Sequence, residues 1–236
     1  MESPVQDTIE SRVQSVLAKI RSAAEKAGRP ASSVRLVAAT KTVPVEKIAE
    51  GVQAGLAILG ENRVQEALSK IPAFNPGPVQ WHFIGQLQRR KVRAVIGVFD
   101  LIHSVDSLEL AQEIDRRAGD AGRRQDVLLE VNIGNEPTKA GFCPDDVRQA
   151  VSELAQLSHI RIKGLMAIPP PTINPDSARP YFRKLAELAK MIDAQHLPSV
   201  KMDELSMGMS NDYEVAIEEG ATLVRVGSAI FGARHV

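Results

Sequence analysis

The chain has 236 residues, 44% of them hydrophobic and 25% charged, which are ordinary values for one large globular domain or two small ones. Lysine and arginine together number 29, as do aspartate and glutamate, so bulk charge gives no preference for nucleic acid or membrane surfaces. The single cysteine, Cys143, excludes an intramolecular disulfide framework, and without a signal-peptide core or an apolar run of ~20 residues we expect a cytoplasmic protein.

The first predicted element is a helix within residues 1–30, where apolar residues follow a helical period. Asp7 is expected to cap it, with Glu10 three residues later, and Gly28 and Pro30 to end it. From residue 35 onward, strand patterns alternate with helix patterns. Eight short segments rich in apolar and β-branched residues are the predicted strands: 35–40, 56–60, 79–85, 100–105, 126–132, 160–168, 204–209 and 222–227.

Helices are predicted between these strands from their start and stop residues. The expected helices run from Pro44 to Gly55, over 108–118 with Asp106 as cap, from Pro144 onward, and over 177–195 after Pro175. The basic run at 89–93 is interpreted as a solvated helical face. Three prolines at 169–171 predict a stiff loop rather than a domain boundary.

Eight strand–helix units without a linker predict an α/β fold. We expect a single TIM-type (β/α)8 barrel over residues 1–236, with the helix in residues 1–30 packed on it as an extra N-terminal element. A doubly wound open sheet is the alternative, but no Gly-x-Gly-x-x-Gly motif follows any predicted strand. Functional side chains of a TIM barrel gather where its strands end, so those positions hold the first candidates for a site.

Lys41 stands directly after the first predicted strand. A long cation in such a place is often a solvated loop residue. At the mouth of a barrel, however, a lysine amine is also a nucleophile that forms a Schiff base with an aldehyde. The far end of the chain favours the second interpretation.

Small polar residues follow the last two predicted strands. Ser210 is expected to cap the helix that continues through Ala216, and Gly227 and Ser228 open a short helical turn. The loops after the seventh and eighth strands are the usual phosphate site of this barrel, so we expect a phosphate group there.

Arg225 alternates with two valines in the last predicted strand, so strand periodicity turns it to the face opposite those valines, which in a barrel can be the inner face. A buried guanidinium needs a partner. The expected partner is either a carboxylate, with Glu61 and Glu130 as candidates, or an atom of a ligand.

Six separated motifs together resemble the pyridoxal phosphate homeostasis protein family, whose barrel is similar to that of bacterial alanine racemase. They occur in order over nearly the whole chain: VAATK at 37–41, GENRVQE at 60–66, WHFIGQLQ at 81–88, KGLM at 163–166, LSMGMS at 205–210 and VRVGSAIFG at 224–232.

The resemblance implies pyridoxal 5'-phosphate (PLP, a form of vitamin B6) as cofactor, bound to Lys41 as a Schiff base. It further implies that Ser210 and the amides of Gly227 and Ser228 hold the phosphate, that Arg225 faces the pyridine nitrogen, and that Asn62 lies near the ring. The family often has threonine in place of Ser228, which keeps both the backbone donor and the hydroxyl.

A few further residues are candidates at the same pocket. Met166 is included among the predicted cofactor-binding residues, and His82 is a second candidate, although a core role fits either of them equally well. Lys139, after the fifth strand, is interpreted first as a surface residue and second as another lysine at the barrel mouth. The scattered histidines show no metal-ligand spacing, so no metal is predicted.

Two classes of function fit the resemblance. One is a non-catalytic carrier that buffers or delivers PLP; the alternative is a PLP-dependent amino-acid racemase or related enzyme. A racemase needs a base on each face of the reacting carbon, and Lys41 serves only one. In alanine racemases the second base is a tyrosine from a C-terminal β domain, and this sequence stops at Val236, with Tyr181 and Tyr213 both in helical segments.

We therefore expect a carrier without catalytic turnover. An arginine at the ring nitrogen also disfavours electron withdrawal by the ring. A sugar-phosphate isomerase on the same barrel leaves Lys41 unexplained. The expected partners are PLP and recipient PLP-dependent apoenzymes, with no nucleic acid or membrane partner, and the expected state is a monomer.

Overall fold

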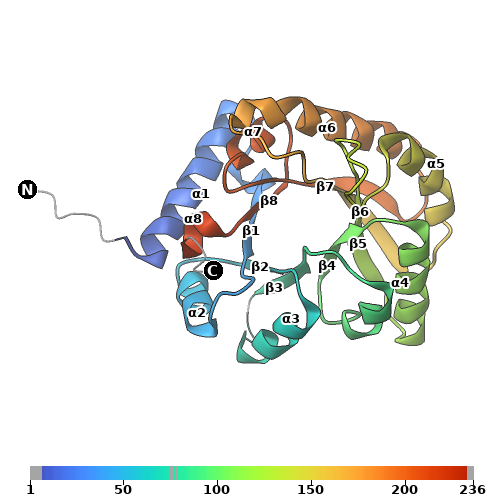
Figure 1. The fold of residues 1–236 in the computed structure, drawn as a ribbon, viewed down its shortest axis with the longest axis horizontal. Coiled ribbons are helices and arrows are strands. Elements are labelled where there is room, and N and C mark those ends of the chain that lie inside the picture. The colour runs from blue at the N-terminus through green and yellow to red at the C-terminus, as the bar shows by residue number, and fades with distance from the viewer. Residues whose placement is uncertain (1–6, 75–76, 78, 233–236) are drawn as a thin grey trace, which may run out of the picture.

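A computed structural model describes residues 7–74, 77 and 79–232. Its eight parallel strands form a closed barrel in which β8 pairs with β1 (Figure 1). The strands are β1 (Arg35–Ala39), β2 (Ile58–Glu61), β3 (Gln80–Phe83), β4 (Leu101–Val105), β5 (Gln125–Glu130), β6 (Ile160–Met166), β7 (Val200–Met209) and β8 (Leu223–Val226). The predicted TIM-type barrel is confirmed, and each predicted strand overlaps an observed one.

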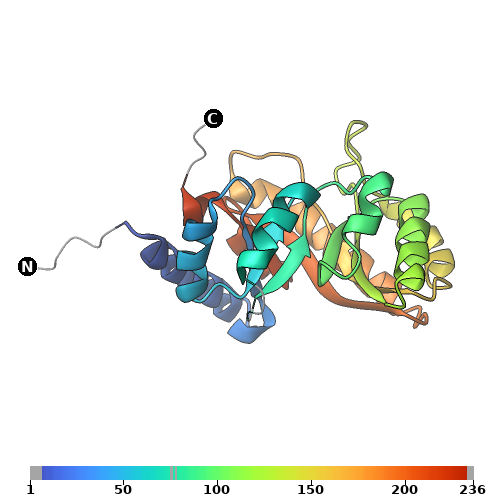
Figure 2. The ribbon, with the colours of Figure 1, turned by 90° about the horizontal axis from the view of Figure 1, so that it is seen from below.

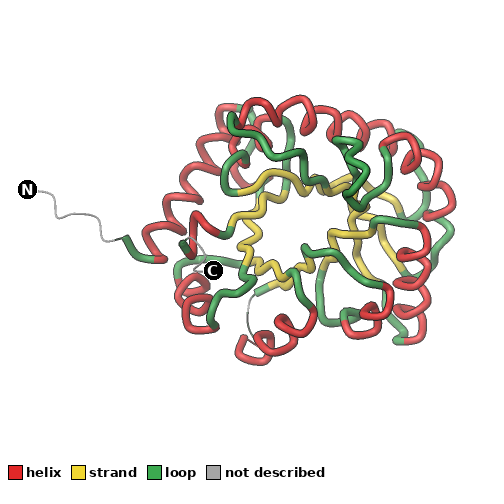
Figure 3. Tube along the Cα trace, viewed as in Figure 1, coloured by secondary structure: helices red, strands yellow, loops and turns green. Residues whose placement is uncertain are grey.

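Helices form an outer ring around the strands (Figure 3). They are α1 (Ile9–Lys26), α2 (Val45–Gln53), α3 (Val64–Lys70), α4 (Leu108–Asp120), α5 (Pro144–Leu154), α6 (Arg179–Asp193), α7 (Tyr213–Glu218) and α8 (Ser228–Phe231). Short 3-10 helices lie at Ala31–Ser33, Ile71–Phe74, Arg89–Ala94 and Pro175–Ala178. The extra helix α1 contacts α2, α7 and α8 (Figure 1), which confirms an N-terminal helix packed on the barrel.

The predicted caps of α1 and α4 are each wrong by one residue. Thr8 caps α1 through a reciprocal pair of hydrogen bonds with Ser11, while Asp7 pairs with Arg12 instead. Ser107 caps α4, and Asp106 accepts a hydrogen bond from the Ser107 hydroxyl. In each case a hydroxyl one residue further along serves as the cap, because its position relative to the first turn decides which orphan N–H it reaches. The basic run at 89–93 belongs to a 3-10 helix, not an α-helix.

Two apolar layers hold the barrel together. The larger one lies between the strands and the surrounding helices and includes Phe83, Phe182 and Ile48, each at most 1% exposed. The smaller one fills part of the barrel interior: Val37, Ile58, Leu101, Leu128, Met166 and Leu223. Along β1, β5 and β8, successive apolar side chains alternate between these layers, as expected in a closed parallel sheet covered by helices.

One side of the barrel carries the loops that follow the strands. Seen from the side, the loops after β5 and β6 rise from the same end of the barrel (Figure 2). Within the described residues, no helix is both long enough and apolar enough to cross a membrane. Residues 233–236, on which the expected absence of a C-terminal β domain depends, lie outside the described part of the chain.

Candidate functional site

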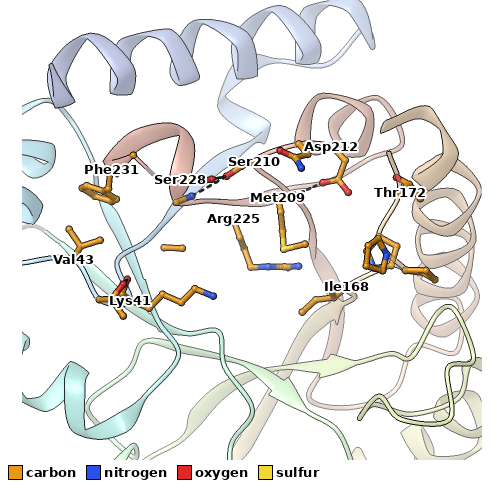
Figure 4. Close-up of a pocket in the computed structure, with 18 of the residues that line it drawn as sticks. Lys41, Val43, Ile168, Thr172, Met209, Ser210, Asp212, Arg225, Ser228 and Phe231 are labelled. Carbon is orange, nitrogen blue, oxygen red and sulfur yellow. Dashed lines mark hydrogen bonds between the residues drawn. The ribbon is translucent and has the colours of Figure 1, made fainter. Parts of the chain in front are cut away.

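A cavity of about 620 Å³ lies at the carboxyl ends of β1, β6, β7 and β8 (Figure 4). Lys41, Ser210, Arg225, Gly227 and Ser228 all line it, so the structure brings together these predicted cofactor-binding residues. In Figure 4 the Lys41 side chain extends into the space beneath Arg225, and the two serines lie above Arg225 in that view.

The turn that carries Lys41 is fixed by hydrogen bonds on both of its sides. Thr40 Oγ1 donates to Glu61 Oε1 at 2.7 Å, and the Thr40 carbonyl accepts from Lys70 Nζ at 2.7 Å. The backbone N–H of Thr42 donates to Glu66 Oε1. Thr42 has a φ of 62°, a left-handed conformation that β-branched residues rarely adopt. The neighbours of Lys41 are thus held in place despite local strain.

Lys70, Glu61 and Glu66 form a buried charge cluster beneath this turn. The Lys70 Nζ lies 2.7 Å from Oε1 of each glutamate, and the Lys70 side chain is 8% exposed while Glu61 is fully buried. Burial raises the pKa of Glu61, and the hydrogen bonds from Lys70 and Thr40 oppose that rise. Glu61 comes from the end of β2, whereas Glu66 and Lys70 share one face of α3. The cluster therefore ties the end of β1 to β2 and α3.

Ser210, Gly227 and Ser228 bring two hydroxyls and a backbone amide together where β7 and β8 end. The two Oγ atoms lie 3.1 Å apart, and the Gly227 N–H donates to Ser210 Oγ at 3.4 Å. A Cβ at Gly227 would lie 3.1 Å from the carbonyl oxygen of Ala39, so glycine allows this close approach to β1. The predicted cap role of Ser210 is wrong: α7 begins after Asp212, and the Ser210 hydroxyl turns to the end of β8 instead.

Arg225 is 5% exposed, and its hydrogen bonds within the described residues go to oxygens of neutral groups. Its Nη1 bonds the Ser206 carbonyl at 2.8 Å and the Ser206 hydroxyl, and its Nη2 bonds the Ala167 carbonyl at 3.0 Å. Within the described residues, neither of the expected carboxylates forms an ion pair with it, because Glu61 pairs with Lys70. Burial lowers the pKa of Arg225 to about 10, opposed by Glu130 and Asp212, so the guanidinium stays charged at neutral pH.

Glu130, at the end of β5, is close enough to Arg225 for the two charges to interact. Burial, together with the charge of Asp106, raises the pKa of Glu130 to about 7, while Arg225 acts in the opposite direction. This carboxyl group therefore changes its charge near neutral pH, beside a permanent cation.

Lys139 lines the same cavity on the side of the β6 loop. Its Nζ lies 2.6 Å from Glu136 Oε1 and also bonds the carbonyls of Ile168 and Pro169. With 32% of its side chain exposed, Lys139 lies at the mouth rather than on a remote surface. The proline segment 169–171 forms the adjoining wall.

Three other predicted residues do not line this cavity. Met166 is 1% exposed and belongs to the apolar layer inside the barrel. Asn62 directly follows β2, and contact of either residue with a cofactor stays a prediction. His82 is buried on β3 and hydrogen-bonded to His103, which is the core role considered for it. Sequence reasoning missed Glu66, Lys70, His103 and Ser206; only the i,i+4 spacing of Glu66 and Lys70 signalled an ion pair.

Comparison with known proteins gives a consistent result. The sequence matches the family model described as alanine racemase, N-terminal domain, over residues 12–235. It is 47% identical over 223 residues to a pyridoxal phosphate homeostasis protein of Aquifex aeolicus, covering 94% of this chain and 97% of that protein. Two structures of PipY from Synechococcus elongatus PCC7942, one without PLP and one with PLP bound, match with TM-scores of 0.85 and 0.83 at 38% and 37% identity. Both alignments cover 95% of this chain and 100% of that chain.

The buried cluster beneath Lys41 predicts a large cost for losing its cation. Lys70→Met leaves the Glu61 carboxylate buried without a counter-charge, so we expect a loss of about 3–5 kcal/mol in the free energy of unfolding. The measurement is guanidinium-chloride denaturation. Lys163→Met, which removes the more exposed Lys163–Asp203 pair, is the control and should cost about 1 kcal/mol or less. Equal losses in the two variants would contradict a buried, charged cluster.

Proposed function

The chain belongs to the family of pyridoxal phosphate homeostasis proteins, and we propose that it holds PLP as a Schiff base on Lys41 and buffers or delivers this cofactor in the cytoplasm. The observation that carries the proposal is the convergence of Lys41, the two serine hydroxyls and Arg225 on one cavity. The relatives' shared name and the PLP-bound structure of PipY support the choice of ligand. The proposal includes a monomeric carrier and PLP-dependent apoenzymes as recipients.

The residues present fit the parts of this cofactor. PLP supplies an aldehyde that bonds reversibly to a lysine amine, a phosphate group, and an aromatic ring with a nitrogen acceptor. The hydroxyls of Ser210 and Ser228 and the amide of Gly227 form a cluster of donors suited to phosphate oxygens. A Cβ at Gly227 would crowd the carbonyl oxygen of Ala39, so glycine is the residue that fits at this position. A cavity of about 620 Å³ is ample for a small ligand.

Arg225 supports binding without serving as an acid. Its pKa of about 10 keeps it protonated at neutral pH, so it donates a hydrogen bond to an acceptor in the cavity and retains its proton. Enzymes that use the ring of PLP to withdraw electrons commonly place an acidic partner at its nitrogen. The cation found here therefore favours holding the cofactor over activating it.

The tyrosines of the chain are poorly placed to act as a second base. Tyr213 is 4% exposed in α7, where burial and then the charge of Glu214 raise the pKa of its hydroxyl to about 12. Tyr181 packs against the core from α6. Neither tyrosine lines the cavity that contains Lys41. This arrangement favours the carrier over the racemase alternative.

The first test concerns the covalent bond. The protein mixed with PLP should show the absorption band of a Schiff base, and borohydride reduction followed by peptide mapping should place the modification on Lys41. Lys41→Ala should abolish the band while leaving the fold intact, since this side chain extends into the cavity from a turn held by other residues. Lys139→Ala, at the mouth, should keep it. If only Lys139→Ala lost the band, the Schiff base would be assigned to Lys139 instead of Lys41.

The second test concerns the phosphate corner. Replacing both Ser210 and Ser228 by alanine removes two hydroxyl donors, and a hydrogen bond to a charged group contributes about 1.5–3 kcal/mol. We expect PLP affinity, measured by spectroscopic titration, to fall by tenfold or more for each lost bond. The affinity for pyridoxal, which lacks the phosphate, should change little and serves as the internal control. A parallel loss for both ligands would remove the phosphate assignment.

The third test separates carrier from racemase. With PLP bound, the protein in deuterium oxide should neither invert L-alanine nor exchange its α-hydrogen at enzymatic rates, because the tyrosine that serves as second base in alanine racemases has no counterpart among the residues that line the cavity. Proton NMR and chiral chromatography measure the two outcomes. Labelled D-alanine formed by the parent protein but not by Lys41→Ala would establish the enzyme instead.

A further inference from the structure

A chain of buried polar side chains leads away from Arg225 through the barrel interior. Ser206 on β7, His103 on β4 and His82 on β3 are exposed by 2% or less. The Ser206 hydroxyl lies 2.9 Å from His103 Nδ1, and His103 Nε2 lies 3.0 Å from His82 Nδ1. Arg225 Nη1 bonds the same hydroxyl from the other side. Four strands thus contribute one side chain each to a continuous chain of hydrogen bonds.

The direction of this chain follows from its first member. A guanidinium only donates, so the Ser206 oxygen accepts from Arg225. The buried Ser206 hydroxyl then keeps its own hydrogen for the other neighbouring atom, His103 Nδ1. A neutral imidazole that accepts at Nδ1 carries its hydrogen on Nε2, so His103 donates to His82 Nδ1. Every bond points away from Arg225, and both histidines carry hydrogen on Nε2.

The charges around the chain agree with neutral imidazoles. Burial and then the charge of Arg35 lower the pKa of His82 to about 3. Burial, followed by the charges of His82, Arg225 and Arg35, holds the pKa of His103 well below its ordinary value. Both rings are therefore uncharged at pH 7 and have one donor and one acceptor nitrogen each, as the one-way chain requires.

The hydrogen-bond chain gives Arg225 one more partner than the two backbone carbonyls that accept from its guanidinium. The carbonyls of Ser206 and Ala167 already accept from the two terminal nitrogens of Arg225. The bond to the Ser206 hydroxyl engages one more N–H group, so that three of the five Arg225 donors are used. It also links the guanidinium to a side chain that is itself hydrogen-bonded to His103. Two donors are then left for an acceptor in the cavity that Arg225 lines.

We propose that Ser206, His103 and His82 are positioning residues whose one-way hydrogen-bond chain orients Arg225, so that its remaining donors meet an aromatic nitrogen acceptor in the cavity. The ligand end of this proposal rests on the proposed PLP function. The existence of the hydrogen-bond chain does not rest on that function, because the chain lies within the protein and can be observed without any ligand.

The first measurement is therefore made on the protein without added PLP. Two-dimensional NMR of protein labelled with ¹⁵N in histidine reports which ring nitrogen of each residue carries hydrogen. At pH 7, His103 and His82 should both be neutral and protonated at Nε2. A hydrogen on Nδ1 of His103, or a positive charge on either ring, would overturn the proposal whether or not PLP binds.

The second measurement uses Ser206→Ala with Ser104→Ala as its matched control. Ser104, next to His103 on β4, is 1% exposed and its hydroxyl has no hydrogen-bond partner within the described residues, so both variants remove one buried hydroxyl. Ser206→Ala should change the ¹⁵N pattern of His103 and shift the absorption maximum of bound PLP. Ser104→Ala should change neither.

Each outcome of this comparison has a separate meaning. If both variants keep the parent's histidine pattern and absorption maximum, the positioning role is wrong. If Ser206→Ala changes the histidine pattern but not the absorption maximum, the chain exists but does not orient Arg225 toward the ligand, which also contradicts the proposal. If the parent protein does not bind PLP, the proposed function is wrong. The direction of the hydrogen-bond chain is then still decided by the first measurement. The same first measurement decides it if Ser206→Ala does not fold.

Discussion

The pairing of β1 with β8 brings the two ends of a long sequence to one point, and the candidate site exists only because of it. Val37 lies opposite Arg225 and Ala38 opposite Val226 in this register. Lys41 follows the first of these strands and Gly227 the second, so the proposed Schiff-base lysine and the proposed phosphate corner line one cavity. Without Gly227, the close approach of the two strand ends at Ala39 is obstructed. The candidate site therefore depends both on the pairing of β1 with β8 and on the absence of a side chain at Gly227.

Two buried cations, Lys70 and Arg225, lie close to this cavity, and each is stabilised by a different kind of partner. Lys70 is neutralised by carboxylates, and the resulting ion cluster holds the backbone on both sides of Lys41. Arg225 is instead satisfied by neutral oxygens and a chain of uncharged rings. A carboxylate hydrogen-bonded to Arg225 would occupy donors of its guanidinium within the protein, whereas the three bonds to carbonyl and hydroxyl oxygens leave two of its five N–H donors for a ligand. The difference matches a rigid turn beside Lys41 in one case and, in the other, the ligand contact proposed for Arg225.

The barrel and the strand-end residues could be predicted from the sequence because both depend on local patterns. Apolar, β-branched runs identify strands, and the rule that function lies at their carboxyl ends leads directly to Lys41, Ser210 and Gly227. The caps of α1 and α4 lie one residue beyond the predicted positions, since capping depends on which hydroxyl faces the first turn. His103 and Ser206 were missed for a deeper reason. They are 103 residues apart, and their contact depends on the stagger of strands in the closed barrel, which no local pattern encodes.

For the proposed carrier function, the proline segment 169–171 that lines the cavity has a consequence for the rate at which PLP would exchange. Pro169, Pro170 and Pro171 line the cavity, and each has its φ angle fixed by its own ring. Such a wall has little freedom to lose when a molecule arrives and little to regain when it departs. If this wall stays in place, we expect the exchange of PLP in the proposed carrier to be governed by making and breaking its bonds to the protein. In the proposed carrier, the residence time of PLP would then depend on the chemistry at the Lys41 amine and at the corner formed by Ser210, Gly227 and Ser228, and substitutions there would adjust it without altering the barrel.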